Sequence, residues 1–184
     1  MSTSPPRSSY ASGTVSSMVR SLLVVGGLVA LLIALVPRVN TISQPPVDVA
    51  AASVEVAKES GWAISRPVGL PDGWKATSVR NVRSTDGLMT WHAGYQSPTG
   101  NYVALEQTKG ATRGWIEAQT NRARQTGELE AAGRTWLAYE RTPKIQRSLL
   151  SKQASADGLT TLITGTGTFE ELTAFAEALK PVQP

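Results

Sequence analysis

One apolar segment constrains this chain more than any other feature. Residues 21–36 read SLLVVGGLVALLIALV and carry no charged side chain. Sixteen residues of helix span roughly 24 Å, somewhat less than the roughly 30 Å hydrocarbon core of a bilayer. The flanking Arg20 and Arg38 make up the difference, because long basic side chains can lie along lipid and place their charge among the headgroups. We therefore predict a transmembrane helix over residues 19–39, in contact with the lipid bilayer.

The residues after this segment bear on whether it is retained. A cleavable signal peptide needs small residues just after its apolar core, and Val36, Pro37 and Arg38 stand there instead. We therefore expect a retained anchor, with cleavage as the alternative. Arg7 and Arg20 lie on the N-terminal side of the apolar run 21–36, whereas Arg38 is the only positive charge between that run and Lys58. This asymmetry predicts a cytoplasmic N-terminus and a domain outside the cytoplasm, since basic residues stay on the cytoplasmic side.

The rest of the chain divides around the anchor. Residues 1–18, rich in Ser, Thr and Pro, predict a disordered cytoplasmic tail. Residues 40–47 predict a linker, because Pro45 and Pro46 favour extended backbone. Residues 48–184 predict one extracytoplasmic domain of ordinary size.

Composition excludes several classes of function. The chain has no cysteine and a single histidine, His92, which excludes a disulfide scaffold, a cysteine nucleophile and a histidine-rich metal site. Of the formal charge of +4, +3 belongs to residues 1–47, which contain three arginines and no acid. The nearly neutral domain does not favour nucleic acid as a partner.

The pattern of the domain alternates between helices and hairpins. Helices are expected over residues 49–60, over residues 112–125 and from Thr168 to Pro181. Strands are expected over residues 74–83, 88–96, 101–109, 128–131, 134–141, 145–153 and 159–164. Short turns between strands force antiparallel neighbours. The fold class predicted is α+β: a curved antiparallel sheet with helices packed on one face, preceded by a single transmembrane helix.

Each predicted helix has an expected cap and an expected apolar stripe. Asp48 is the expected N-cap of the first, with its stripe on Ala50, Val54 and Ala57. In the second, which Thr112 opens and Gly127 ends, the inward residues are Trp115, Ile116 and Gln119. The third has a capping box of Thr168 and Glu171 and a stripe of Leu172, Phe175, Ala176 and Leu179.

No motif in the domain specifies a chemistry. Gly165–Thr166–Gly167–Thr168 lies between a strand and a helix, as phosphate-binding loops do, but Glu170 and Glu171 would repel an anion there. These glycines are expected to serve the turn and close packing. His92 points away from Trp91 and Tyr95 on the alternation and is interpreted as a satisfied or exposed histidine. The sequence predicts no catalytic residue, no metal ligand and no cofactor.

Five tryptophans outnumber the two phenylalanines. An indole buries a large area and needs one hydrogen-bond partner, so we expect these residues to anchor the core. The alternative is a ligand groove lined by some of them, with Trp74, Trp91 and Trp136 as the candidate ligand-binding residues.

Several short motifs resemble a known family. They include Leu70–Pro71–Asp72–Gly73–Trp74, Trp91 with Gly94–Tyr95, Tyr102–Val103–Ala104–Leu105, Trp115, Gly133 with Trp136, and Gly165–Thr166. With the single N-terminal anchor, these motifs resemble an actinobacterial family of membrane-anchored envelope proteins, domain-of-unknown-function family 4245. The resemblance implies an envelope location and no established activity, so it assigns no site residues.

The sequence thus predicts a single-pass cell-membrane protein that displays a non-enzymatic binding or interaction domain. The expected partner is an envelope protein or a wall or lipid ligand; the oligomeric state is left open. One alternative is a carrier or sensor of apolar ligands with a Trp-lined groove. The other is an envelope hydrolase, which a cleft pairing His92 with an aspartate and a serine would favour.

Overall fold

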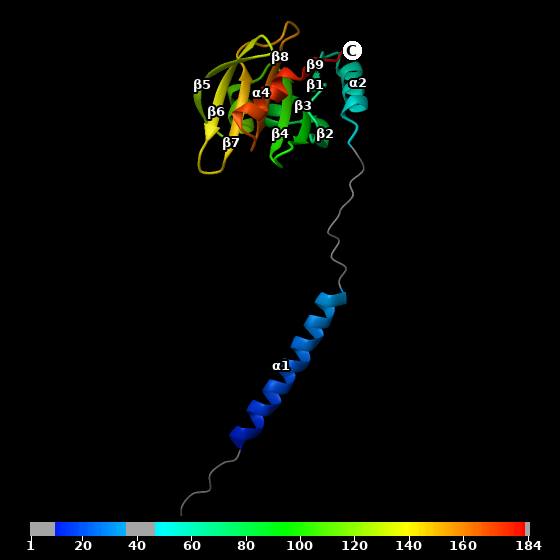
Figure 1. Cartoon of the computed structure of the whole chain (residues 1–184), viewed down its shortest axis with the longest axis vertical. Coiled ribbons are helices and arrows are strands. Elements are labelled where there is room, and N and C mark those ends of the chain that lie inside the picture. The colour runs from blue at the N-terminus through cyan, green and yellow to red at the C-terminus, as the bar shows by residue number, and fades with distance from the viewer. Residues whose placement is uncertain (1–9, 36–46, 183–184) are drawn as a thin grey trace, which may run out of the picture. The chain divides into compact units, whose positions relative to one another are not determined.

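The computed structural model describes residues 10–35 and 47–182. The chain separates into two compact units, Met1–Gln44 and Pro45–Pro184, and each is described by itself. Figure 1 shows the order of the elements. Residues 1–9 of the expected tail and residues 40–46 of the expected linker lie outside the described residues.

The first unit contains one long helix, α1 (Tyr10–Leu35). Its window Ser16–Ile33 is apolar enough to cross a membrane, and none of that window is buried. By length and composition this suits an anchor or a signal sequence near the N-terminus. Residues 10–18, expected in a disordered tail, belong to this helix instead, because helical hydrogen bonding continues through the small polar residues that precede the apolar core.

The second unit is an α+β domain built on an antiparallel sheet, as predicted. Seven strands pair in the order β2-β3-β4-β8-β7-β6-β5. Their bounds are β2 Lys75–Arg83, β3 Met89–Gln96, β4 Tyr102–Lys109, β5 Arg124–Ala131, β6 Arg134–Arg141, β7 Gln146–Ser151 and β8 Leu159–Gly165. β1 (Ser65–Pro67) and β9 (Leu179–Pro181) form a separate antiparallel pair, and a 3₁₀ turn, η1 (Thr85–Gly87), joins β2 to β3.

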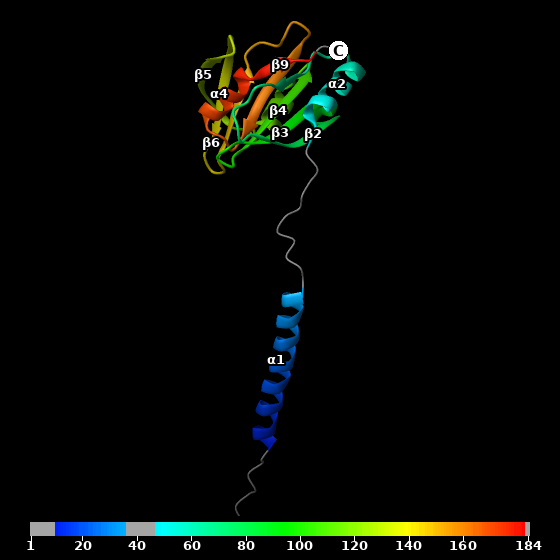
Figure 2. The ribbon, with the colours of Figure 1, turned by 45° about the vertical axis from the view of Figure 1, so that its right-hand side comes forward.

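The main core lies on one face of the seven-stranded sheet. Helices α2 (Val49–Ser60) and α4 (Phe169–Glu177) both contribute to it (Figure 2). The strands supply their alternate residues, among them Trp91, Val103 and Ile163, each fully buried. This period of two is the one predicted for the strands on either side of the Ser97–Gly100 turn.

The third helix, α3 (Arg113–Gln119), packs on the opposite face. Its Trp115 is fully buried against Leu150 and Leu162, which point away from the main core. The helices of the domain therefore do not all share one face: α2 and α4 do, and α3 does not. The cause lies in the strands, because Leu137, Leu150 and Leu162 make an apolar patch on this second face.

Three expectations about the helices need correction. The buried stripe of α2 is Val49, Ser53, Val56 and Ala57, not Ala50, Val54 and Ala57. Val54 is 40% exposed. Ser53 is accommodated in the core because its hydroxyl donates to the carbonyl of Ala50 at 2.8 Å, which removes the cost of burying it.

The other two helices end earlier than predicted. α3 stops at Gln119, since Asn121 and Arg122 have positive φ angles of 52° and 56°, and β5 begins at Arg124. α4 stops at Glu177. Leu179 instead forms part of β9, opposite Pro67 of β1, because a strand pairing there satisfies the backbone that follows the helix.

Both predicted N-terminal caps of α2 and α4 are present. Asp48 accepts from the amide of Ala51 at 2.9 Å. Thr168 and Glu171 form the reciprocal capping box of α4. The glycines before that helix serve packing, as expected: a Cβ on Gly165 would lie 1.9 Å from the carbonyl oxygen of Tyr102.

Candidate functional site

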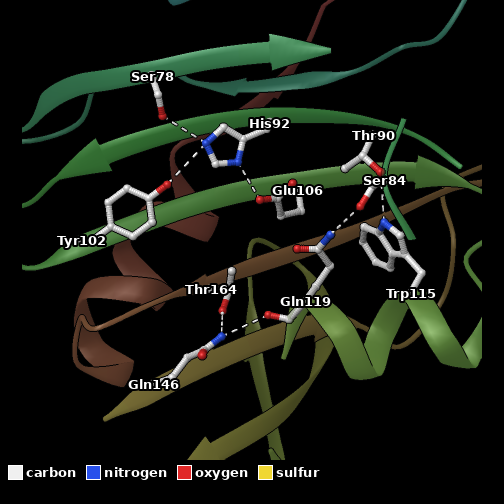
Figure 3. A network of polar contacts seen from close by, with 10 residues as sticks. All are labelled: Ser78, Ser84, Thr90, His92, Tyr102, Glu106, Trp115, Gln119, Gln146 and Thr164. Carbon is white, nitrogen blue, oxygen red and sulfur yellow. Dashed lines mark hydrogen bonds and ion pairs between the residues drawn. The ribbon is translucent and has the colours of Figure 1, made fainter. Parts of the chain in front are cut away.

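The candidate site is a polar cluster on the second face of the sheet, beside α3. Polar side chains from β2, β3 and β4 meet there because residues of the same parity on paired strands share a face. In the register, His92 lies opposite Glu106 on one side and Arg80 on the other, and Ser78 lies opposite Gly94. Figure 3 shows the cluster and its hydrogen bonds.

A buried pair of titratable residues forms its centre. Nδ1 of His92 lies 2.6 Å from Oε1 of Glu106, and the two residues are only 2% and 6% exposed. A carboxylate accepts, so Nδ1 carries the proton and donates to Glu106, which leaves the lone pair of Nε2 free in the neutral ring. The expectation of a satisfied or exposed histidine is resolved in favour of the satisfied one.

Two hydroxyl groups approach the other nitrogen of His92. The Ser78 hydroxyl lies 3.0 Å from Nε2 and the Tyr102 hydroxyl 3.3 Å from it. Burial raises the pKa of Tyr102 above its ordinary 10.0. The side chain of Ser78 opposes this shift, and the charges of Glu106 and Arg80 have smaller effects that raise and lower the pKa respectively. Tyr102 is therefore a neutral hydroxyl at physiological pH.

A glycine makes this arrangement possible. A Cβ on Gly94 would lie 2.5 Å from Oγ of Ser78 and 2.7 Å from the hydroxyl of Tyr102, both well inside van der Waals contact. The hydrogen atom on Gly94 therefore leaves the space in which the two side chains reach His92.

A second group of hydrogen bonds fixes α3 to the sheet. Nε1 of Trp115 donates to Oγ1 of Thr90 at 3.0 Å, and Nε2 of Gln119 donates to Oγ of Ser84 at 3.1 Å. From β7, Nε2 of Gln146 donates to the carbonyl of Gln119 at 3.0 Å and to Oγ1 of Thr164 at 2.8 Å (Figure 3). These contacts make α3 a fixed wall beside the cluster.

Between α3 and the first strands lies a hollow of about 120 Å³. Its polar lining is formed by Arg80, Arg83, Ser84, Thr90, His92, Glu106 and Gln119. The His92–Glu106 pair is its buried part, and the two arginines are exposed. None of the ion pairs in residues 47–182 involves Arg80 or Arg83, so both cations are available to a ligand.

The tryptophans proposed for a groove lie elsewhere. Trp91 is fully buried and donates to the carbonyl of Ser65 at 3.2 Å. Trp136 is 1% exposed and donates to the carbonyl of Ala131 at 3.0 Å. Trp74 is half-buried, with its ring 5.6 Å from that of Phe175. None of the four main cavities in residues 47–182 is lined by more than one of these three rings, and their positions are those of core anchors.

Sequence reasoning missed Ser78, Arg80, Arg83, Tyr102, Glu106 and Gln119 as members of a site. One signal was present for Glu106. The predicted turn Ser97–Gly100 closes a hairpin in which the paired positions are set by the turn, and that register places Glu106 directly opposite His92. The short turn between the strands predicted over residues 74–83 and 88–96 also indicates that β2 pairs with β3, but nothing local in the sequence indicates that α3 covers this face.

No group of three or more His, Asp or Glu side chains suited to a metal ion occurs within residues 10–35 and 47–182. The arrangement can bind a polar group through Glu106 and the arginines. It can also polarise the Ser78 hydroxyl through His92.

Comparison with known proteins identifies one family. A family model described as a protein of unknown function (DUF4245) matches residues 11–179, which covers most of α1 and nearly all of the domain. No curated protein matches the sequence.

Proposed function

The chain belongs to the DUF4245 family of proteins of unknown function, and from that premise we propose that it is a single-pass membrane protein displaying a non-enzymatic binding domain outside the cytoplasm. The apolar α1 is the anchor, with its N-terminus in the cytoplasm. The domain is the functional part, and it binds a polar ligand of the cell envelope in the hollow between β2–β4 and α3.

The observation that carries this proposal is the uncommitted capacity of a buried carboxylate. Glu106 lines the hollow, is 6% exposed, and accepts from His92 through Oε1. No hydrogen bond described within residues 47–182 uses its Oε2. Oδ1 of Asn81 is the only buried side-chain acceptor without a partner among the described residues, so Oε2 of Glu106 is open to the hollow, where a ligand can donate to it.

Fixed walls also support a binding role. A ligand gains most affinity where the site needs little reordering on binding. Here the floor is the buried, hydrogen-bonded His92–Glu106 pair between paired strands, and α3 is held by Trp115 and Gln119.

The experiment is a thermal-unfolding screen on the full chain in detergent micelles. The library contains amino acids, hydroxy acids, sugars and inorganic anions. At least one class is expected to raise the melting temperature, and Val82→Trp, which places an indole at the hollow, should abolish that rise. The matched control is Val54→Trp on α2, because Val54 and Val82 have similar exposed fractions of 40% and 44%. A library without any stabilising compound would contradict the proposal.

An envelope hydrolase is the second candidate, and one observation favours it. Ser78, His92 and Glu106 are hydrogen-bonded in the order of a serine hydrolase triad. In that reaction Oγ of Ser78 would bond to an ester carbonyl carbon while His92 takes the hydroxyl proton and passes it to the departing alkoxide; water would then release the acyl group. It ranks second because Ser78 is not among the residues lining the hollow, so a substrate held there does not face Oγ.

A fluorophosphonate probe separates the two candidates. It bonds covalently to an activated serine and would label the wild-type chain at Ser78 but not Ser78→Ala if the chain is a hydrolase. Under the binding proposal, neither chain is labelled and ligand-induced stabilisation survives in Ser78→Ala.

A further inference from the structure

The ligand class can be inferred from the charges around the hollow. The buried part of the hollow offers one free acceptor, Oε2 of Glu106, and this residue is only 6% exposed. A ligand group next to it must donate, as a hydroxyl or an ammonium does. An apolar or purely anionic group there would leave the carboxylate oxygen desolvated without a partner.

The outer lining has the opposite preference. Arg80 and Arg83 are both exposed, and neither is in an ion pair among residues 47–182. Nη1 of Arg83 donates to the carbonyl of Gly87 at 3.1 Å, and Arg83 lies opposite Met89 in the register. Arg80 lies opposite His92, so Arg80 is the cation on the face of the hollow. Guanidinium groups match the geometry of a carboxylate, which they can bind through two parallel hydrogen bonds.

The size of the hollow limits what can enter. Its volume of about 120 Å³ corresponds to roughly four water molecules at about 30 Å³ each in the liquid. That space suits the polar end of a molecule, with a carboxylate and one neighbouring donor group.

We propose that the hollow between β2–β4 and α3 binds a small amino- or hydroxy-carboxylate group, whose ammonium or hydroxyl donates to Oε2 of Glu106 and whose carboxylate bonds to Arg80. This inference rests on the proposed binding function and specifies its ligand. The group belongs to a free amino or hydroxy acid or to the end of a larger envelope molecule.

A phosphate group suits the hollow less well, although two arginines often bind phosphate. The carboxylate of Glu106 would face a group with up to two negative charges, and like charges brought together in a poorly solvated space repel strongly. The carboxylate of an amino or hydroxy acid carries a single negative charge, and the donor that faces Glu106 is a separate group of the same molecule.

The test is a ligand-observed NMR titration of the full chain in detergent micelles. The probes are glycine, glycolate, acetate and inorganic phosphate. Glycine or glycolate should bind at least about tenfold more tightly than acetate, since acetate lacks the donor and loses a hydrogen bond to a charged group. Comparing glycine with glycolate distinguishes the ammonium from the hydroxyl as the natural donor.

Variants locate the binding. Glu106→Gln keeps an acceptor for His92 but turns an amide towards the hollow, so it should weaken glycine or glycolate about tenfold or more while leaving acetate nearly unchanged. Arg80→Ala should weaken all carboxylate probes, and Arg83→Ala should weaken them clearly less. Arg124→Ala, which removes an exposed arginine of β5 outside this hollow, is the matched control and should leave every titration unchanged.

Each other result overturns the inference in a distinct way. Phosphate binding more tightly than glycine and glycolate, with loss in Arg80→Ala, would leave the binding function standing and replace the ligand class. Equal affinities for acetate and glycolate would show that Glu106 does not accept a hydrogen bond from the ligand. No binding by any probe, together with a library that contains a stabilising sugar, would assign a different ligand. No binding by any compound would overturn the binding function as well.

Discussion

Nδ1 of His92 donates to Oε1 of Glu106 at 2.6 Å, from directly opposed positions of β3 and β4. Both side chains are nearly fully buried, so each depends on the other for its hydrogen bond. A buried pair of this kind adds little stability in itself but makes the loss of one partner expensive. The pair also forms the floor of the hollow between β2–β4 and α3. Among the main cavities in residues 47–182, this is the one that both Arg80 and Arg83 line.

Residues 45–184 are expected to fold without α1. The contacts of this unit are internal, with its own core on both faces of the sheet, and its length is that of an ordinary domain. The isolated fragment should show a single cooperative thermal transition by circular dichroism. A gradual loss of signal without a midpoint would contradict this.

Removing the carboxylate of Glu106 should destabilise the domain strongly. Glu106→Ala leaves Nδ1–H of His92 buried without an acceptor and should lower the free energy of unfolding by about 2–4 kcal/mol. Glu106→Gln retains an acceptor and should cost less than half as much. Denaturant unfolding of the 45–184 fragment measures both, with the exposed Glu55→Ala as the control. Equal losses in the two Glu106 variants would show that hydrogen bonding to His92 is not the cause.

Phe175 should be one of the most sensitive core positions. It is fully buried, with its ring centre 5.6 Å from that of Trp74 and 5.2 Å from that of Tyr95. Phe175→Ala should cost about 3–5 kcal/mol through lost burial and the cavity left behind. Phe169→Ala, at a half-buried position of the same helix, should cost clearly less. A loss below about 1 kcal/mol for Phe175→Ala would mean that α4 is peripheral to the core.

Glu171 should make the domain less stable in acid. Burial alone would raise the pKa of Glu171, but hydrogen bonds outweigh it and lower the pKa to about 2, from an ordinary 4.5. The donors are the side chains of Ser97, Thr99 and Asn101 and the amide of Thr168. Because the pKa is lower in the folded state, this stabilisation is complete above pH 4.5 and is lost as the pH falls towards 2.

Replacing Glu171 tests whether its ionised carboxylate causes this loss of stability in acid. Glu171→Gln should reduce the free energy of unfolding by about 1 kcal/mol at pH 6, a modest value because solvent screens a partly exposed group. The difference from wild type should shrink at pH 2.5. Glu177→Gln at the other end of α4 is the control and should follow the wild-type pH dependence. A difference that stays constant from pH 6 to 2.5 would contradict the assignment.

The topology can be tested directly because the chain has no cysteine. Single cysteines in Ser4→Cys and Gln153→Cys mark the two sides of α1, and Gln153 is exposed. A membrane-impermeant maleimide added to intact cells should label Gln153→Cys, whereas Ser4→Cys should react only after permeabilisation. The reverse pattern would place the domain in the cytoplasm.

Local sequence determined those parts of the protein whose causes are local. The caps at Asp48 and Thr168 require residues within one helical turn. The alternation of Trp91, Ala93 and Tyr95 needs one strand and its period. The apolar run of α1 needs only its own length and composition. The α+β class followed from these local patterns and from turns too short to allow any but antiparallel neighbours.

Tertiary structure decided what depends on residues far apart in the chain. Leu179 continues the apolar period of α4, yet it lies in β9 because pairing with β1 brings it opposite Pro67. Gln119 joins the same face as His92 only because α3 packs on Leu150 and Leu162. These pairings are chosen by the total area they bury and the hydrogen bonds they complete. No local sequence pattern reports this total, because it depends on segments far apart in the chain. The resulting packing brings Glu106, Arg80 and Arg83 around one hollow.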